Sequence, residues 1–143
     1  LAGFDPGHAA NVLISAGRAI TLKLANQREA AAPDAPVTIA RTSWLDLAAA
    51  TALADPALDM ANPMKGPFEA VHCDAADEAA AALILARHAG LLPAFFILPG
   101  KAVGATPVTI DEIHGYEAAN RLRIVARARS IFCQSRLTSG NKA

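Results

Sequence analysis

The stretch from Lys65 to Gly100, KGPFEAVHCDAADEAAAALILARHAGLLPAFFILPG, decides the fold that we expect. It holds an alternating run at Phe68–Cys73, an acidic helix start at Asp74, an alanine-rich body and a stop at Gly90. An apolar run, Ala94–Leu98, follows. This order of patterns is typical of a strand, a helix and a second strand, the unit that builds a parallel sheet.

Both ends of this helix are marked in the sequence. Asp74 is placed to accept hydrogen bonds from the free N–H groups of the first turn, and Asp77 and Glu78 put negative charge at the positive end of the dipole. Arg87–His88 lies in the last turn, where positive charge is favoured, and Gly90 is able to adopt the left-handed stop. We therefore expect a helix from Asp74 to Gly90.

The remaining patterns predict an α/β fold: a single domain with a mixed or mostly parallel sheet and packed helices. The run Ala94–Leu98 has no polar alternation, so we expect both of its faces to be buried, as in a central strand. The other expected elements are strands at Asn11–Ala16, Val37–Ala40 and Arg123–Arg127 (an edge strand), and helices at Arg18–Ala25, Trp44–Ala54 (capped by Ser43) and Glu112–Leu122 (capped by Asp111 or Thr109). Loops are expected at Gln27–Ala35 and at Ala57–Pro67, which carries two exposed methionines, Met60 and Met64.

Length and composition limit the class of protein. A chain of 143 residues suits one domain, and we expect a domain over residues 1–129 that lacks its N-terminal part, followed by a mobile tail over 130–143. Zero net charge and 53% hydrophobic residues disfavour a nucleic-acid partner. No apolar run has the roughly 20 residues that a membrane span needs, and the chain starts without a signal pattern, so we expect a cytoplasmic protein. Two cysteines form neither a disulfide framework nor a zinc site.

The strongest candidate for chemistry is the run His72–Cys73–Asp74, together with Asp77 and Glu78. It lies where a strand leads into a helix, and ligands collect at that end of α/β sheets. A metal would use His72 or Cys73 with a carboxylate, and Asp77 or Glu78 would act as the general base. The alternative is helix capping with one partly buried histidine, because acidic first turns are expected from the dipole alone.

Two cations are candidates for binding phosphate. Lys65 precedes Gly66–Pro67, where the backbone is permissive, but the glycine spacing of a phosphate loop is missing, and a tight turn is the alternative. Arg18 ends Ser15–Arg18, which resembles an anion nest at a helix start or a plain turn. No serine, histidine and acid combination indicates a nucleophile.

Several segments resemble the riboflavin-pathway enzyme dihydroxybutanone phosphate synthase. They are Leu53–Pro56, Lys65–Phe68, Asp77–Ala94 and Val108–Ile113 with Tyr116. The segments Leu13–Gln27, Leu45–Phe68 and Leu122–Arg129 more closely resemble the synthase-like N-terminal domain that precedes GTP cyclohydrolase II in some bacteria. The resemblance implies a partial synthase-like fold.

The residues that carry catalysis in that family are not retained. The synthase has Gly-His-Thr-Glu-Ala at the helix start. When the two sequences are aligned on the pattern Ala-Gly-Leu-x-Pro-Ala, which both contain, the synthase histidine, threonine and glutamate align with Glu78, Ala79 and Ala80. Its Arg-Pro-Gly-His loop aligns with Lys65–Phe68, where only a positive charge remains. Magnesium requires oxygen ligands, which alanine lacks. The resemblance therefore implies a family fold that has lost its chemistry.

The expected function is a non-catalytic, synthase-like domain of a riboflavin-pathway GTP cyclohydrolase II, serving as a scaffold or dimerisation module with no cofactor. Synthases of this family are dimers, which implies a homodimer here, with a cyclohydrolase domain attached or separate. One alternative is a magnesium-dependent lyase that converts ribulose phosphate to dihydroxybutanone phosphate and formate with His72, Asp74, Asp77 and Glu78. The other is a module that senses a nucleotide or sugar phosphate.

Overall fold

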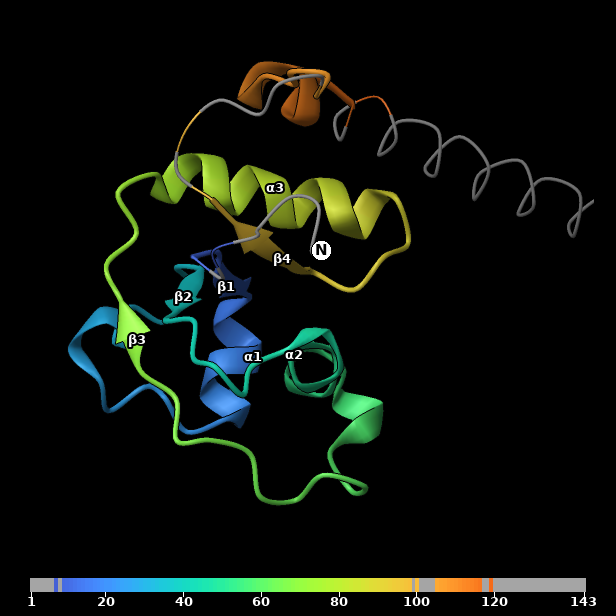
Figure 1. Ribbon diagram of the computed structural model, residues 1–143. Coiled ribbons are helices and arrows are strands. Elements are labelled where there is room, and N and C mark those ends of the chain that lie inside the picture. The colour runs from blue at the N-terminus through green and yellow to red at the C-terminus, as the bar shows by residue number, and fades with distance from the viewer. Residues whose placement is uncertain (1–6, 8, 99, 101–104, 117–118, 120–143) are drawn as a thin grey trace, which may run out of the picture. The chain divides into compact units, whose positions relative to one another are not determined.

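The computed structural model describes Gly7, residues 9–98, Gly100, residues 105–116 and Ala119 (Figure 1). The chain divides into two compact units, Leu1–Thr106 and Pro107–Ala143, and each is described by itself. The edge strand expected at 123–127 and the tail expected at 130–143 lie outside the described residues. Across the described part of the chain, no helix combines the length and the apolar character needed to cross a bilayer.

The first unit contains a four-stranded sheet. Its strands are β1 (Asn11–Ile14), β2 (Val37–Ile39), β3 (Ala70–Val71) and β4 (Ala94–Ile97), in the order β3-β2-β1-β4. The three pairings are all antiparallel. The unit is thus an α/β domain, as expected, but the prediction of a mixed or mostly parallel sheet is wrong.

The reason for this error lies in α3 (Ala76–His88), which connects β3 to β4. The strand-helix-strand order was correctly predicted, but β3 and β4 occupy opposite edges of the sheet, because β1 and β2 lie between them. A βαβ unit gives a parallel sheet only when its strands run in the same direction in one sheet. Here the alternating pairings make β3 and β4 antiparallel to each other.

Helices cover the two faces of the sheet, as Figure 1 shows. Val12 and Ile14 of β1 pack with residues of α1 (Ala16–Thr21) and α2 (Leu47–Ala54) in the larger core. Leu13 points to the other face and packs against α3. The unit therefore has three layers: α1 with α2, the sheet, and α3.

Strand β4 differs from its prediction in position. It pairs with β1 and forms an edge of the sheet, and its four residues are only half-buried. Ala94 and Phe96 pack against the larger core, whereas Phe95 and Ile97 pack against the α3 side. β4 lacks polar alternation because helices cover both faces of the sheet. Its apolar sequence therefore does not require a neighbouring strand on each side of β4.

The helix boundaries near α1 and α2 also differ from those expected. Helix α1 begins at Ala16, two residues earlier than predicted, because the Ser15 hydroxyl accepts a hydrogen bond from the Arg18 N–H at 3.3 Å. Helix α2 begins at Leu47 and is capped by Asp46, whose carboxylate accepts from the Ala49 N–H at 2.8 Å. Ser43 is therefore not the cap. The expected loops contain two single 3-10 turns, η1 (Arg28–Ala30) and η2 (Pro56–Leu58).

Helix α3 confirms one predicted end and corrects the other. Its N-cap is Ala75, which makes no capping hydrogen bond, and the Asp74 side chain is 98% exposed, so Asp74 is not the cap. Its C-terminal stop is confirmed: Gly90 has a φ of +69°, and the Leu91 N–H donates to the Ala86 carbonyl at 2.9 Å. These contacts form a Schellman motif.

The second unit is described over a short helix at residues 110–116. Of the two predicted caps, Thr109 is the correct one. Its N–H donates to the Glu112 carboxylate at 2.7 Å, and the Glu112 N–H donates to the Thr109 hydroxyl at 3.3 Å. This is a capping box, and its hydrogen bonds lower the pKa of Glu112.

Candidate functional site

A cavity of about 430 Å³ lies between the sheet and the N-terminal half of α3, and we call it the α3-face cavity. Its apolar wall consists of Leu13 and Ile97 from the sheet with Ala79 and Ala82 from α3. Its polar lining contains Asn11, Thr38, His72, Cys73, Asp74 and Glu78. Three of the four residues predicted as catalytic candidates, His72, Asp74 and Glu78, are thus brought together at one cavity, whereas Asp77 is not part of its lining.

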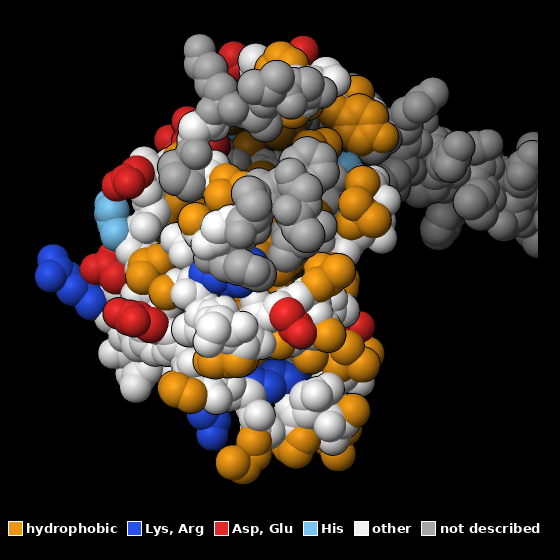
Figure 2. Space-filling view, in the orientation of Figure 1, with side chains coloured by type: hydrophobic (Ala, Val, Ile, Leu, Met, Phe, Trp, Pro, Cys, Tyr) orange, Lys and Arg blue, Asp and Glu red, His pale blue; other side chains and the backbone are white. Residues whose placement is uncertain are grey.

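His72 lies between two carboxylates. Its Nδ1 is 3.3 Å from the Glu29 carboxylate, and its Nε2 is 3.5 Å from the Asp74 carboxylate. Figure 2 shows acidic side chains in red around a histidine in pale blue on one side of the molecule. The imidazole is largely exposed, so the expected partly buried histidine is not found. These contacts place negative charge beside the mouth of the α3-face cavity.

Thr38 provides a polar group in the depth of this cavity. It is the middle residue of β2 and is only 2% exposed. Within the described residues its hydroxyl has no hydrogen-bond partner. A buried hydroxyl without a partner is unfavourable, because it gives up its hydrogen bonds to water. Among the described residues, Thr38 and Arg18 are the two buried residues that are polar or charged.

The magnesium ion that the family resemblance implies does not fit the residues present. Of the three aligned positions, only Glu78 carries an oxygen ligand, because Ala79 and Ala80 have none. Among the described residues, no three His, Cys, Asp or Glu side chains form a group that could hold a metal ion.

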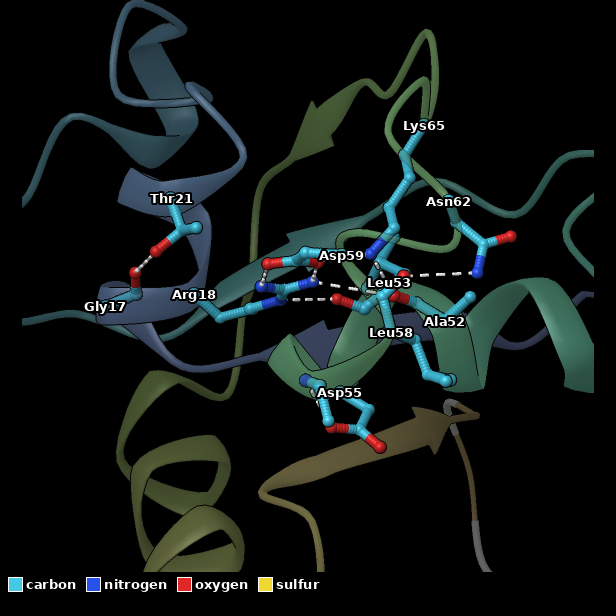
Figure 3. A network of polar contacts seen from close by, with 11 residues as sticks. Gly17, Arg18, Thr21, Ala52, Leu53, Asp55, Leu58, Asp59, Asn62 and Lys65 are labelled. Carbon is cyan, nitrogen blue, oxygen red and sulfur yellow. Dashed lines mark hydrogen bonds and ion pairs between the residues drawn. The ribbon is translucent and has the colours of Figure 1, made fainter.

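Arg18, a predicted phosphate ligand, makes several contacts within the protein (Figure 3). Its side chain is 7% exposed, and its guanidinium makes a bidentate contact with the Asp59 carboxylate, at 2.5 and 2.7 Å. Its Nε donates to the Leu53 carbonyl at 2.6 Å, at the C-terminal end of α2. Arg18 therefore joins α1 to α2 and to the loop after η2.

Lys65, the second predicted phosphate ligand, converges on the same carboxylate. Its side chain is 10% exposed, forms an ion pair with Asp59 and donates to the Ala52 carbonyl at 2.5 Å. Figure 3 shows Arg18 and Lys65 pointing toward Asp59 from different segments. Hydrogen bonds from both cations hold the pKa of Asp59 well below its ordinary value of 3.8. The two expected phosphate ligands are thus engaged by one internal anion.

Three residues that matter at these sites were not predicted: Asp59, Thr38 and Asn11. Asp59 lies in a loop with no periodic pattern, so its role depends on the tertiary contacts of Arg18. A hydroxyl between two apolar residues, Val37 and Ile39, was the available signal for Thr38. Asn11 begins β1, and its side-chain amide oxygen Oδ1 accepts a hydrogen bond from the Arg41 backbone N–H at 3.1 Å.

A second hollow lies beside the edge strand. It has a volume of about 170 Å³ and is lined mainly by apolar side chains of β4 and α2. Leu47 and Leu92 line it and are exposed. We call this surface the β4-edge groove. Elsewhere, Met60 and Met64 are almost fully exposed, as predicted, in the loop that follows η2, at the bottom of Figure 1.

Comparisons with known proteins found no relative. No protein-family model matches the chain, and neither the curated proteins nor the solved structures give a match.

Proposed function

We propose that this chain is a non-catalytic, synthase-like domain of a riboflavin-pathway GTP cyclohydrolase II that acts in the cytoplasm as a scaffold and dimerisation module. The observation that carries the proposal is that Arg18 and Lys65 both form ion pairs with Asp59. Cations that bind a substrate phosphate must be accessible to it, whereas these two are buried in contacts that hold α2 and the η2 loop in place. They support a structural role.

The β4 edge supports the dimer. Strand β4 is paired on one side within the described sheet, and its sequence, Ala-Phe-Phe-Ile, is wholly apolar. Exposed edges of this kind are usually protected, because they pair readily with another strand. The exposed leucines of the β4-edge groove add apolar surface beside this strand. Pairing of β4 with β4 of a second copy would cover both the edge strand and the β4-edge groove.

The test is the oligomeric state of the full chain, measured by size-exclusion chromatography with light scattering. We expect a dimer for the wild type and a monomer for Leu47→Glu, which puts a charge in the β4-edge groove. Ile20→Glu is the control: Ile20 is 55% exposed, close to the 59% of Leu47, but does not line the groove. Met64→Glu examines the methionine loop as the alternative interface.

Each result has a definite meaning. A monomeric wild type at high concentration would overturn the dimer. Dissociation by Met64→Glu but not by Leu47→Glu would move the interface to the methionine loop. Release of formate from ribulose phosphate in the presence of magnesium would contradict the non-catalytic assignment and favour the lyase. We expect no formate.

A further inference from the structure

We infer that the α3-face cavity is a binding site for a small organic cation with an apolar body, such as an amine that also carries a hydroxyl group. This site goes beyond the proposed scaffold function and does not depend on it, because all of its lining residues belong to one copy of the chain. Three observations carry the inference: the volume of the cavity, the charge of its rim and the buried hydroxyl of Thr38.

The volume and lining resemble those of small-molecule sites. Such sites are typically cavities of about 300–1,000 Å³, mostly apolar, with a few polar groups that orient the ligand. The α3-face cavity has a volume of about 430 Å³. Its apolar wall comes from both the sheet and the helix, through Leu13, Ile97, Ala79 and Ala82. Three of these four residues pack around the smaller core, so the ligand body would extend that core.

The charge of the rim selects the sign of the ligand. Asp74 and Glu78 are both part of the lining, and Glu29 lies next to them through His72. Among the described residues that line the cavity, none is a lysine or an arginine. Carboxylates at this position repel a phosphate or a carboxylate and attract an ammonium group. The site therefore differs in sign from the sugar-phosphate site expected of the family.

Thr38 supplies the second recognition group. Its hydroxyl is buried, has no partner within the described residues and belongs to the lining. Because buried polar groups are normally hydrogen-bonded, a hydroxyl in a cavity wall with no partner among the described residues is available to a polar group that a ligand brings. A ligand hydroxyl that reaches Thr38 would supply the missing hydrogen bond. The ammonium group would remain near Glu78 and Asp74.

Three probes of similar shape test the two recognition groups separately. Tyramine carries an ammonium group and a hydroxyl, phenethylamine lacks the hydroxyl, and 4-hydroxyphenylacetate replaces the ammonium group by a carboxylate. Binding is measured as protection of Cys73, a half-buried lining residue, from alkylation by iodoacetamide. The full chain carries Cys133→Ser, so that Cys73 is the only thiol. Amide chemical shifts by NMR give an independent affinity.

We expect tyramine to bind about tenfold more tightly than 4-hydroxyphenylacetate, since both carboxylates favour the cation. Tyramine should exceed phenethylamine by about fivefold, the value of one hydrogen bond. Thr38→Val should abolish the difference in affinity between tyramine and phenethylamine and leave the difference between tyramine and 4-hydroxyphenylacetate unchanged. Glu78→Gln should reduce the difference in affinity between tyramine and 4-hydroxyphenylacetate. Asp34→Asn is the matched control, because it removes the same charge from an exposed residue that does not line the cavity.

The opposite results are equally clear. Stronger protection by 4-hydroxyphenylacetate than by tyramine would overturn the cationic class. An unchanged alkylation rate together with unchanged amide shifts, for all three probes at millimolar concentration, would overturn the site itself. If light scattering finds a monomer and that monomer still binds tyramine, the proposed dimer is wrong and the inferred binding site stands.

Discussion

The two faces of the sheet are packed in different ways. On the α1/α2 face, the core is continuous, and the buried cations Arg18 and Lys65 share Asp59 as their partner. On the α3 face, the core consists of Leu13, Ala79 and Leu83 with a few half-buried neighbours, beside a cavity of about 430 Å³. Since protein interiors are normally close-packed, the α3 face is the exception. The α1/α2 face provides stability, whereas the α3 face retains a hollow that contains a hydroxyl without a partner among the described residues, and this hollow is where we propose that a ligand binds.

The largest expected effect is the loss of Arg18 from the well-packed face. Arg18→Ala removes the bidentate contact with Asp59 and the hydrogen bond to Leu53. Arg18 is buried and the Asp59 side chain is 35% exposed, so the substitution breaks a partly buried ion pair and also leaves the Leu53 carbonyl without its partner. We expect the free energy of unfolding to fall by about 3 kcal/mol. Chemical denaturation measures it. Arg28→Ala is the control, because the Arg28 side chain is 96% exposed, and it should have almost no effect. Equal effects of the two substitutions would show that the Arg18 contacts contribute nothing.

The same contacts predict the response to acid. Because the pKa of Asp59 is lower in the folded chain than its ordinary value of 3.8, its stabilising contribution is fully present above that value. It is lost as the pH falls below 3.8 toward the folded pKa. We therefore expect acid unfolding curves of Asp59→Asn to be shallower than those of the wild type in this range. Identical pH dependence would mean that Asp59 does not couple to Arg18 and Lys65.

A pair of leucines compares the packing of the two faces directly. Leu53 and Leu13 are both fully buried, but Leu53 belongs to the α1/α2 face and Leu13 lines the cavity. Truncation of a buried leucine costs about 2–5 kcal/mol, depending on the surrounding packing. We expect Leu53→Ala to destabilise by about 3 kcal/mol and Leu13→Ala by about 2 kcal/mol. The reverse order, measured by denaturation, would contradict the difference between the faces.

Thr38→Val examines the α3 face alone. Valine has nearly the same shape as threonine and removes the unpartnered hydroxyl. We expect the protein to become more stable by about 1 kcal/mol, because folding no longer removes that hydroxyl from water without a compensating hydrogen bond. The equivalent change at Thr51, whose hydroxyl donates to the Leu47 carbonyl at 2.8 Å, should give no such gain. Destabilisation by Thr38→Val would imply a partner for the Thr38 hydroxyl.

The smallest effect concerns the helix ends on the two faces. Helices α1 and α3 both end in a Schellman motif, with Lys23 at φ +60° in one and Gly90 at +69° in the other. The left-handed conformation suits glycine, so we expect Lys23→Gly to stabilise by about 0.5 kcal/mol and Gly90→Ala to destabilise by about 1 kcal/mol. Thermal unfolding measures both. The same sign for both would contradict the shared geometry.

The sequence predicted elements better than their arrangement. Apolar runs, the charges in the first and last turns of α3 and the stop at Gly90 are local signals, and the corresponding elements were found. The antiparallel sheet was missed because strand order depends on which segments meet across the whole unit. Asp74 was the wrong cap because the chain at Ala75 turns before the helix begins.

The candidate site was predicted in part. His72, Asp74 and Glu78 lie close in the sequence, so local spacing sufficed to bring them to one cavity. Arg18 and Lys65 are predicted phosphate ligands because each positive charge adjoins a turn or a permissive backbone, but both contact Asp59, which lies 41 residues beyond Arg18. A contact at this separation leaves no periodic trace in the sequence. Thr38 was missed because it occupies an ordinary strand position.

The path of α3 also determines how the first unit should open. This helix links the two outermost strands, so its detachment would loosen β3 and β4 at the same time while β1 and β2 still hold each other. Hydrogen exchange follows such cooperative units, and a unit held by few large side chains opens most readily. Amides of α3, β3 and β4 should therefore exchange together and before those of β1, and an amine bound beneath the helix should slow all three.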